Sequence, residues 1–325
     1  MIVAFLDLLG FSALLQTDTE VALDNINSLN NVIKTRFNDD RSHPLSECKE
    51  RHPNDTDFHN FVEKSSITAF EQMISISDSL ILGGTNCDLF IMQLANFVGT
   101  VYIRYSEPFK KPFTDISKVL TDKVADVLPC GSKRNHNAFP LLFRGGISVG
   151  KKIVFFNQNY IKNGKLQRSL LNVMGLTYLN AVKLESFGKG PHLFCDKSVV
   201  DVVNEKTRRI LREIDKDKGI YEIVWTIEGL ADKEYTDKWK NVTDRINDTM
   251  LPSAINLYHY YRKNEHLEVQ YKELLKLVCQ GIVKYAADEC NCAEDAISLI
   301  NQKLPDGLSI NKSILDNFLP ESKLQ

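Results

Sequence analysis

The pattern of apolar and polar positions at the start of the chain predicts a strand, a turn and a helix. Residues 2–8 form a short apolar run with β-forming side chains, which is typical of a buried strand, and Gly10 ends it. Polar residues at 17–20 can begin a helix, and apolar residues then recur at helical spacing as far as Phe37. The chain therefore opens with a buried strand that leads into an amphipathic helix.

A second pattern predicts a hairpin with an acid at its tip. Residues 66–76 have the composition of a strand, and residues 79–82 have that of its partner. Ser77-Asp78 between them is a turn signal, because both residue types favour turns. We therefore expect Asp78 at the tip of a two-stranded hairpin.

Strand and helix patterns alternate as far as about residue 235, and only helical patterns follow. We predict an α/β (α+β) fold over 1–235, with a mixed or antiparallel sheet flanked by helices, and a C-terminal helical region over 236–325. The individual predictions are loops at 38–64 and 107–139, helices at 89–105, 170–186 and 255–287, and strands at 141–149, 193–194 and 220–225, with 153–156 able to pair with 141–149.

Composition and charge exclude several classes of function. The 325 residues include 40 basic and 42 acidic side chains, and a net charge of −2 argues against a broad cationic surface for nucleic acid. No apolar run approaches the ~18 residues that span a bilayer, and the N-terminus has neither a basic region nor a cleavage site. The seven scattered cysteines are typical of reduced cytosolic thiols. We expect a cytoplasmic protein with no nucleic-acid or membrane partner.

Two aspartates occupy positions where carboxylates carry chemistry. Asp7 lies near the end of the first predicted strand, and Asp78 lies at the hairpin tip. If they meet at one sheet edge, they can share divalent ions, because Mg²⁺ is commonly bound by one or two carboxylates together with substrate phosphates. Gly10 would let backbone N–H groups approach a polyphosphate. The alternative is that Asp7 caps a helix and Asp78 is an ordinary turn residue.

Four segments, taken in order, resemble the motifs of class III nucleotide cyclases. In that family a strand carries the first metal-binding aspartate, a hairpin tip carries the second, a glycine-containing strand follows, and a helix completes the site. The likeness covers most of residues 1–190, and its specificity lies in the order of the motifs. The corresponding segments are FLDLLGFS at 5–12, ISISDS at 74–79, RGGISVG at 144–150 and the predicted helix over 175–186.

The resemblance implies a metal-dependent site that binds a nucleoside triphosphate. Asp7, Asp78 and the backbone carbonyl of Leu8 would hold two Mn²⁺ or Mg²⁺ ions per site. Gly10 and Phe11 follow the first aspartate and belong to the implied substrate-binding residues. The chemistry implied is phosphoryl transfer, in which a protein mainly positions groups and stabilises charge.

The resemblance also implies a homodimer with composite active sites. In the family the metal pair and the helix that stabilises the transition state belong to different protomers. Asn180 and Lys183 on the predicted helix are the implied catalytic residues. Arg144, which begins the glycine-containing strand, either contacts substrate or forms a structural ion pair.

The departures from the family pattern bear on the base and on the catalytic helix. Ile74 occupies the position at which purine cyclases carry a lysine or glutamate that reads the base. Leu179 replaces the transition-state asparagine, with Asn180 one place later, and Lys183 replaces an arginine. Lysine supplies positive charge without the bidentate fork of arginine. Ser77 replaces the glycine before the second aspartate.

These departures, with the loop at 38–64 and the helical C-terminal region, make the chain most similar to the pyrimidine nucleotide cyclases of bacterial Pycsar anti-phage systems. That likeness implies conversion of UTP, slightly favoured, or CTP to the 3′,5′-cyclic monophosphate and pyrophosphate, as a signal for a separately encoded effector. Ile74 would form an apolar wall beside the base, unless it is a core residue. Two alternatives stay open, a purine (adenylate or guanylate) cyclase and a catalytically inactive module that binds a nucleotide or partner.

Overall fold

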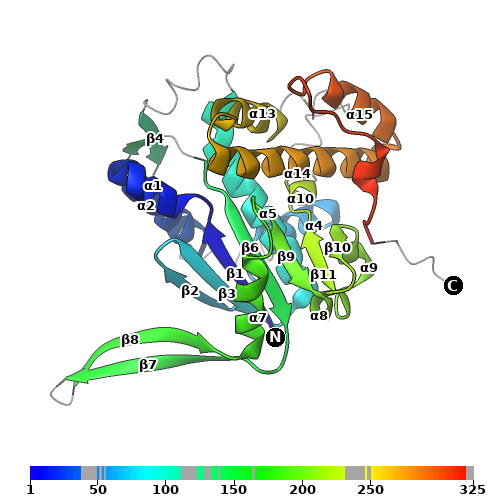
Figure 1. Cartoon of the computed structure of the whole chain (residues 1–325). Coiled ribbons are helices and arrows are strands. Elements are labelled where there is room, and N and C mark those ends of the chain that lie inside the picture. Colours follow the sequence, from blue (N-terminus) through cyan, green and yellow to red (C-terminus); the bar gives the residue numbers. More distant parts are fainter. Residues whose placement is uncertain are drawn as a thin grey trace.

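The computed structural model is built around one seven-stranded sheet (Figure 1). From one edge to the other the strands are β10 (Leu211–Asp215), β11 (Ile220–Ile223), β9 (Leu193–Asp196), β6 (Phe143–Val149), β1 (Ile2–Leu8), β3 (Ser79–Gly84) and β2 (Gln72–Ile76). All neighbouring strands are antiparallel except β6 and β9, which are parallel. The predicted mixed sheet is therefore confirmed. The structure describes residues 1–37, 50, 53–54, 56–110, 123–127, 133–137, 140–162, 165–230, 246 and 250–319.

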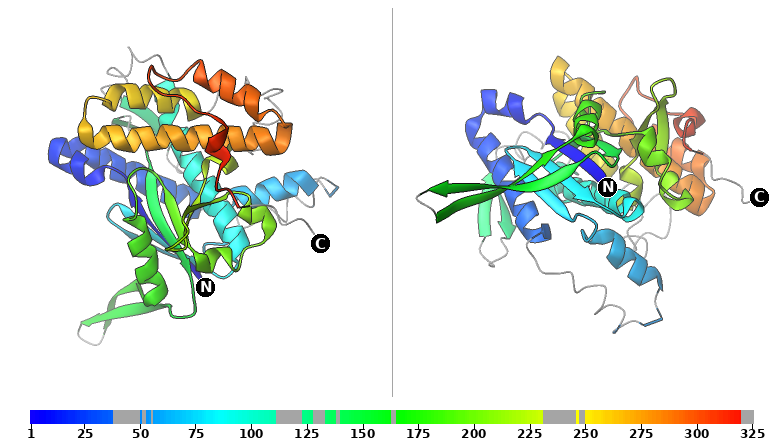
Figure 2. Two further views of the ribbon diagram at one scale, coloured as in Figure 1. Left: turned by 45° about the vertical axis from the view of Figure 1, so that its right-hand side comes forward. Right: turned by 90° about the horizontal axis from the view of Figure 1, so that it is seen from below.

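Helices cover both faces of this sheet and one end of it (Figures 1 and 2). Helix α7 lies on one face, α5 lies on the other, and α14 runs across the end of the strands. The helices are α1 (Phe11–Thr17), α2 (Thr19–Phe37), α4 (Thr56–Ser65), α5 (Cys87–Ser106), α7 (Leu176–Glu185), α8 (Lys197–Val200), α9 (Glu205–Arg208), α10 (Thr226–Leu230), α13 (Met250–Tyr261), α14 (Glu265–Cys290) and α15 (Ala293–Asn301), with 3₁₀ turns η1 (Glu107–Lys110) and η3 (Lys312–Leu315).

Strand β1 lies in the middle of the sheet and is buried on both faces. Ile2, Ala4, Leu6 and Leu8 belong to the main hydrophobic core, whereas Val3 belongs to a smaller cluster on the α7 face. A strand covered on both sides reads as a continuous apolar run, which explains why its sequence was recognisable as a strand. Because side chains alternate along a strand, Asp7 shares the α7 face with Val3.

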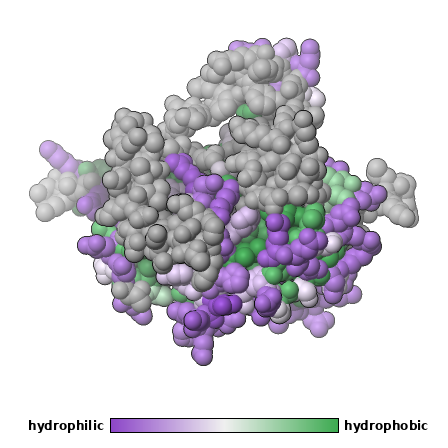
Figure 3. Space-filling view, turned by 90° about the horizontal axis from the view of Figure 1, so that it is seen from above, coloured by the Kyte–Doolittle hydropathy of each residue, from purple (hydrophilic) through white to green (hydrophobic). Residues whose placement is uncertain are grey.

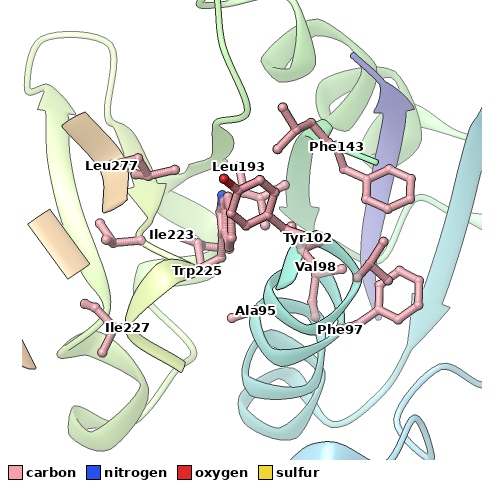
Figure 4. Packing of buried hydrophobic residues seen from close by; sticks show 14 of the residues in the cluster. Ala95, Phe97, Val98, Tyr102, Phe143, Leu193, Ile223, Trp225, Ile227 and Leu277 are labelled. Atoms are coloured by element: carbon pink, nitrogen blue, oxygen red, sulfur yellow. The ribbon is translucent and has the colours of Figure 1, made fainter. Parts of the chain in front are cut away.

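The main core joins the sheet to the C-terminal helices. Tyr102 on α5 packs edge-on against Trp225, and Leu277 on α14 lies in the same cluster (Figure 4). The Trp225 indole N–H donates to the carbonyl of Pro191 over 2.8 Å. The Thr226 hydroxyl donates to the carbonyl of Leu277 over 2.8 Å, so α10 and α14 are joined by a buried hydrogen bond as well. The polar groups of Trp225 and Thr226 thus have partners in this core, as low-dielectric surroundings require.

A long hairpin projects from the body of the molecule. Strands β7 (Val154–Lys162) and β8 (Lys165–Met174) pair only with each other and extend away from the sheet in every view (Figures 1 and 2). Two predictions are wrong here. Residues 153–156 do not pair with 141–149, and the helix predicted from 170 begins only at Leu176. The apolar residues in 166–173 fit both the helical period and the strand period, and pairing with β7 selects the strand.

Other predictions need smaller corrections. Helix α4 lies in the segment predicted as a loop over 38–64, most of whose remainder lies outside the described residues. Two short strands, β4 (Lys123–Val127) and β5 (Lys133–Asn137), lie in the predicted loop over 107–139. The strand predicted from 66 begins at Gln72, and the helix predicted at 255–287 is two helices that Asn264 separates by capping α14. The predicted boundary at 235 lies outside the described residues.

On the face seen from above, most of the visible described residues are hydrophilic, and they flank a smaller hydrophobic area (Figure 3). None of the helices in the described part of the chain is both long enough and apolar enough to cross a bilayer.

Candidate active site

The register of three strands places a row of polar side chains on the α7 face of the sheet. Asp7 on β1 lies opposite Ser79 on β3 and opposite Arg144 on β6. Residues directly opposite each other in antiparallel strands share a face of the sheet, with Cβ atoms ~5 Å apart. We call Arg144, Asp7 and Ser79 the charged row. Its formation requires only the pairing of β1 with its two neighbours.

Both oxygens of the Asp7 carboxylate accept hydrogen bonds. The Ser79 hydroxyl donates to Oδ1 over 3.0 Å. Arg144 donates to Oδ2 from Nη2 over 2.9 Å and from Nε over 3.2 Å. These are charge-assisted bonds in a partly buried place, and such bonds are stronger than neutral ones. Asp7 is not a helix cap, because Gly10 precedes α1.

Asp78 lies in the turn between β2 and β3, as predicted. The backbone N–H of Leu8 donates to the Asp78 carbonyl over 3.0 Å, which holds the hairpin tip against the end of β1. Ser77 before it has a φ of 55°, in the left-handed region that favours glycine. The backbone of Asp78 is thereby fixed beside the residue that follows Asp7.

Glu185 is a site residue to which the sequence analysis gave no role. It lies at the end of α7, buried, and its carboxylate contacts the Nε of Arg144. Burial raises the pKa of Glu185, the Arg144 charge opposes that rise, and the negative charge of Asp7 adds to it. The guanidinium of Arg144 therefore lies between two carboxylates that come from different elements. The clue in the sequence was an acid one helical turn after the buried Ala181, since a buried carboxylate needs a cation.

Gly146 allows α7 to come this close to the sheet. A Cβ at Gly146 would lie 1.9 Å from the carbonyl oxygen of Ala181 and 2.7 Å from the backbone nitrogen of Glu185. No side chain larger than hydrogen fits between β6 and α7 without displacing one of them. Gly146, two residues after Arg144, therefore sets the distance at which Glu185 can reach the guanidinium.

Gly10 and Phe11 follow the charged row in the chain. Gly10 has a φ of 81°, which only glycine adopts readily, and this turn ends β1 and begins α1. A Cβ there would lie 3.9 Å from the side-chain oxygen of Gln270 on α14. The Phe11 side chain is buried in the main core. Their predicted contact with substrate stays a prediction.

Ile74 lies on the same face as the charged row, one pair of residues further along. It is opposite Ile81, which is opposite Phe5 on β1. Its side chain is 9% exposed and belongs to the smaller cluster with Val3 and Ala181. In this structure Ile74 is a core residue, which is the second of the two interpretations its sequence allowed.

Asn180 and Lys183 lie on the side of α7 opposite Glu185. Lys183 is exposed and Asn180 is partly exposed, whereas Ala181 and Glu185 face the sheet. The exposed Leu179 shares this outer side, 52% of its surface being accessible. Within one chain the structure therefore brings Asp7, Ser79, Arg144 and Glu185 together, but it places Lys183 on the outer surface of the helix.

A second charged cluster lies beyond β6 in the strand order, at β9, β11 and β10. The buried Glu222 carboxylate contacts the His192 imidazole and accepts from Arg212 Nη2 over 2.6 Å. Glu273 on α14 lies 3.7 Å from His192 Nε2. Burial opposes the charged imidazolium, but the two carboxylates outweigh it and raise the pKa of His192 to about 9. The His192 carbonyl accepts from the N–H of Gly145, so this cluster supports the strand that carries Arg144.

The donor atoms near the charged row suit a hard divalent cation. Asp7 and Asp78 supply carboxylates at neighbouring strand ends, and each carboxylate oxygen has more than one lone pair. Within the described ranges no group of three His, Cys, Asp or Glu side chains is placed to bind a metal. Two carboxylates still fit Mg²⁺ or Mn²⁺ when substrate phosphates supply further oxygens.

Comparison with known proteins gave only distant structural neighbours. No protein-family model matches the chain, and a search of curated proteins found no significant match. Solved structures similar to it include the guanylyl cyclase Cya2, with a TM-score of 0.37, 13% identity, and coverage of 69% of this chain and 90% of that one. The guanylate cyclase domain of RhGC from Catenaria anguillulae in complex with GTP has a TM-score of 0.37, 13% identity, and coverage of 68% and 94%.

A further neighbour is the dimeric guanylyl cyclase domain of the RhoGC fusion protein from the aquatic fungus Blastocladiella emersonii. Its TM-score is 0.35, with 13% identity and coverage of 68% of this chain and 94% of that one. Overlap at these TM-scores does not establish a common fold or a common activity. The functional proposal below therefore rests on the residues of the site and on the motifs that the sequence carries.

Proposed function

We propose that the protein is a nucleotide cyclase that converts a pyrimidine nucleoside triphosphate, UTP slightly favoured over CTP, to the 3′,5′-cyclic monophosphate and pyrophosphate. One observation carries the proposal. The aspartates of the two cyclase-like metal motifs lie at neighbouring strand ends, joined by the Leu8 to Asp78 backbone hydrogen bond. Motifs far apart in sequence are thus brought to one edge of the sheet.

The residues of this edge have distinct roles in the proposed reaction. Asp7, Asp78 and the Leu8 carbonyl would hold two Mn²⁺ or Mg²⁺ ions. When bound, such ions supply charge for the triphosphate and lower the pKa of the attacking hydroxyl. The backbone N–H groups of the turn at Gly10 and Phe11 would bind the phosphates. Orientation of the ribose hydroxyl toward the α-phosphorus is the main task left to the protein.

Asn180 and Lys183 are proposed to act on the partner protomer's substrate. Lys183 is exposed on the outer side of α7, where a second copy of the chain can approach it. Its ammonium would stabilise charge that develops on the phosphates. The proposed homodimer has two-fold symmetry, so each site combines the aspartates of one chain with α7 of the other.

The base preference is proposed from the lack of a polar side chain at position 74, where the buried Ile74 is a core residue. A purine cyclase needs polar groups that read the base edge, and an isoleucine offers neither donor nor acceptor. Ile74 lies one pair of residues from the charged row, on the same face. In a bacterial anti-phage role of the Pycsar type, the product would activate a separately encoded effector.

Product analysis tests the proposal. Purified protein is incubated with Mn²⁺ and, separately, with UTP, CTP, ATP and GTP, and the products are identified by mass. We expect one cyclic pyrimidine monophosphate, absent from the Asp78→Asn variant. A cyclic purine product would retain the cyclase and overturn the base preference. No product from any of the four, with the protein folded, would overturn the enzyme assignment.

One observation favours a second function, that of an inactive module that binds a nucleotide. Arg144 donates twice to Asp7 Oδ2, where a catalytic cation would bind. Leu179 and Lys183 also depart from the family pattern. This function predicts that nucleotide binding, measured by calorimetry, survives in the Asp78→Asn variant and that no triphosphate is turned over by the parent protein.

A further inference from the structure

One guanidinium lies between two carboxylates at the candidate site. Arg144 donates from Nη2 and Nε to Asp7 Oδ2, and its Nε also contacts the carboxylate of Glu185. Asp7 belongs to β1 and Glu185 belongs to α7, so the arginine also joins the helix to the sheet. The three formal charges sum to −1, so the cluster keeps a net negative charge that attracts a cation.

A divalent cation that binds Oδ2 of Asp7 would compete with Arg144 for that atom. Oδ2 of Asp7 accepts both arginine bonds, whereas Oδ1 accepts from the Ser79 hydroxyl, whose hydrogen can rotate away. A cation that takes Oδ2 must therefore break charge-assisted bonds. It would also place positive charge beside the guanidinium, and that repulsion drives the arginine away from Asp7.

Glu185 is the acceptor that remains when Arg144 leaves Asp7. Its carboxylate is already in contact with Nε and is held in place by the close packing of α7 on Gly146. It is 8% exposed, so an unpaired charge there is costly, and a full pair with arginine removes that cost. The guanidinium fork can satisfy one carboxylate with two parallel bonds.

We propose that Arg144 is a positioning residue that pairs with Asp7 while the protein is free of metal and transfers its hydrogen bonds to Glu185 when a divalent cation binds Asp7. The inference rests on the proposed metal site. It assigns a role to Glu185, which keeps the guanidinium bound after the exchange. It also makes the affinity for metal depend on two residues that do not touch the metal.

Binding of Mn²⁺ alone to the full-length protein tests the exchange. Free Mn²⁺ is measured by electron paramagnetic resonance in the absence of nucleotide. Arg144→Gln removes the competitor, and we expect Mn²⁺ to bind about tenfold more tightly, the equivalent of one charge-assisted hydrogen bond. Glu185→Gln removes one of the two carboxylates beside Arg144 and leaves Asp7. We therefore expect Mn²⁺ to bind severalfold more weakly.

The double variant separates exchange from a simple loss of charge. Without Arg144 there is no guanidinium for Glu185 to accept, so Glu185→Gln should change the affinity little in the Arg144→Gln background. Arg262→Gln is the matched control, because it removes an exposed arginine in the turn between α13 and α14. If Arg144→Gln unfolds, Arg144→Lys keeps the charge without the fork and should tighten binding to a smaller extent.

Several results would overturn the exchange. Equal weakening by Glu185→Gln in both backgrounds would mean that Glu185 acts on the metal directly or through its field. Unchanged or weaker binding in folded Arg144→Gln and Arg144→Lys would remove Arg144 as a competitor. A cyclic product accompanied by such affinities would overturn the exchange and leave the proposed function in place. Absence of Mn²⁺ binding in every variant would overturn the exchange, and the product analysis with nucleotide would then decide the proposed function separately.

Discussion

Gly146 on β6 lies so close to Ala181 on α7 that a Cβ on the glycine would be 1.9 Å from the alanine carbonyl oxygen. This contact explains why position 146, in the middle of the sheet, is a glycine. Gly145 faces the other way, where a Cβ would lie 2.6 Å from the Leu6 side chain. The pair of glycines thus permits close packing on both faces of β6, directly beside Arg144.

The first prediction is that Gly146→Ala destabilises the protein and loosens the site. Because the added methyl group must push backbone atoms apart, we expect a loss of about 1–3 kcal/mol in the free energy of unfolding, measured with denaturant. The matched control is Gly83→Ala, whose nearest contacts would be side-chain atoms, the ring of Phe155 at 2.7 Å and the Gln72 Cβ at 3.5 Å. Equal losses in the two variants would contradict the argument.

The second prediction concerns the hairpin tip. Ser77 is held at a φ of 55°, which costs a residue with a Cβ about 1–2 kcal/mol, and glycine avoids that cost but loses more entropy on folding. We expect Ser77→Gly to stabilise the protein by about 0.5–1 kcal/mol. Ser75→Gly, at an exposed position inside β2, should instead destabilise it. Thermal unfolding of both variants measures these effects. A shift of the unfolding temperature in the same direction in both would refute the account.

The third prediction distinguishes the two aspartates. Asp7→Asn and Asp78→Asn should both abolish the proposed cyclase activity. Only Asp7→Asn removes the ion pair with Arg144, so it should also cost about 1–3 kcal/mol of stability, whereas Asp78→Asn in the turn should change stability by less than about 0.5 kcal/mol. Activity is measured as cyclic product and stability by denaturant unfolding. Full activity in either folded variant would remove that aspartate from the site.

The fourth prediction is a loss of stability at alkaline pH that depends on His192. The pKa of His192 is about 9 in the folded protein against 6.5 for a free histidine. The folded state therefore binds an extra proton between these values, and the stability it provides is complete below pH 6.5 and is lost as pH rises toward 9. The total is at most about 3.5 kcal/mol, at about 1.4 kcal/mol per pKa unit.

Unfolding curves from pH 6.5 to 8.5 measure this effect. In His192→Gln the slope of stability against pH should become flatter, whatever the stability of the variant at pH 6.5. His266→Gln, at an exposed position at the start of α14, is the control and should keep the parent slope. A parent protein equally stable across this range would show that the imidazole is not held in its charged form by Glu222 and Glu273.

The parts of the site that could be predicted are those that local sequence determines. Asp7 lies next to last in an apolar strand and Asp78 belongs to a turn signal, and both lie where the pattern placed them. The same holds for the strands at the centre of the sheet and for the helices of the C-terminal region. Each of these elements follows from the spacing of apolar residues within one segment.

The parts that could not be predicted depend on pairing between distant segments. Glu185 meets Arg144 only because α7 returns across β6, and nothing local to either residue signals the other. The β7–β8 hairpin was missed because its second strand has apolar residues that also fit a helix. The sequence left two interpretations of Ile74 open, and only its packing in one cluster with Val3, Ile81 and Ala181 makes it a core residue.

Helix α14 contacts successive parts of the molecule along one straight element. Gln270 approaches the Gly10 turn, Glu273 faces His192, and the Leu277 carbonyl binds Thr226. Its 26 residues span about 39 Å at 1.5 Å per residue. A helix is stiff over the short stretch from Gln270 to Leu277, so the turn after Asp7 and the β9 side of the sheet contact one rigid segment. A displacement of that segment would move both contacts together, and with them the two strands that carry Asp7 and Arg144.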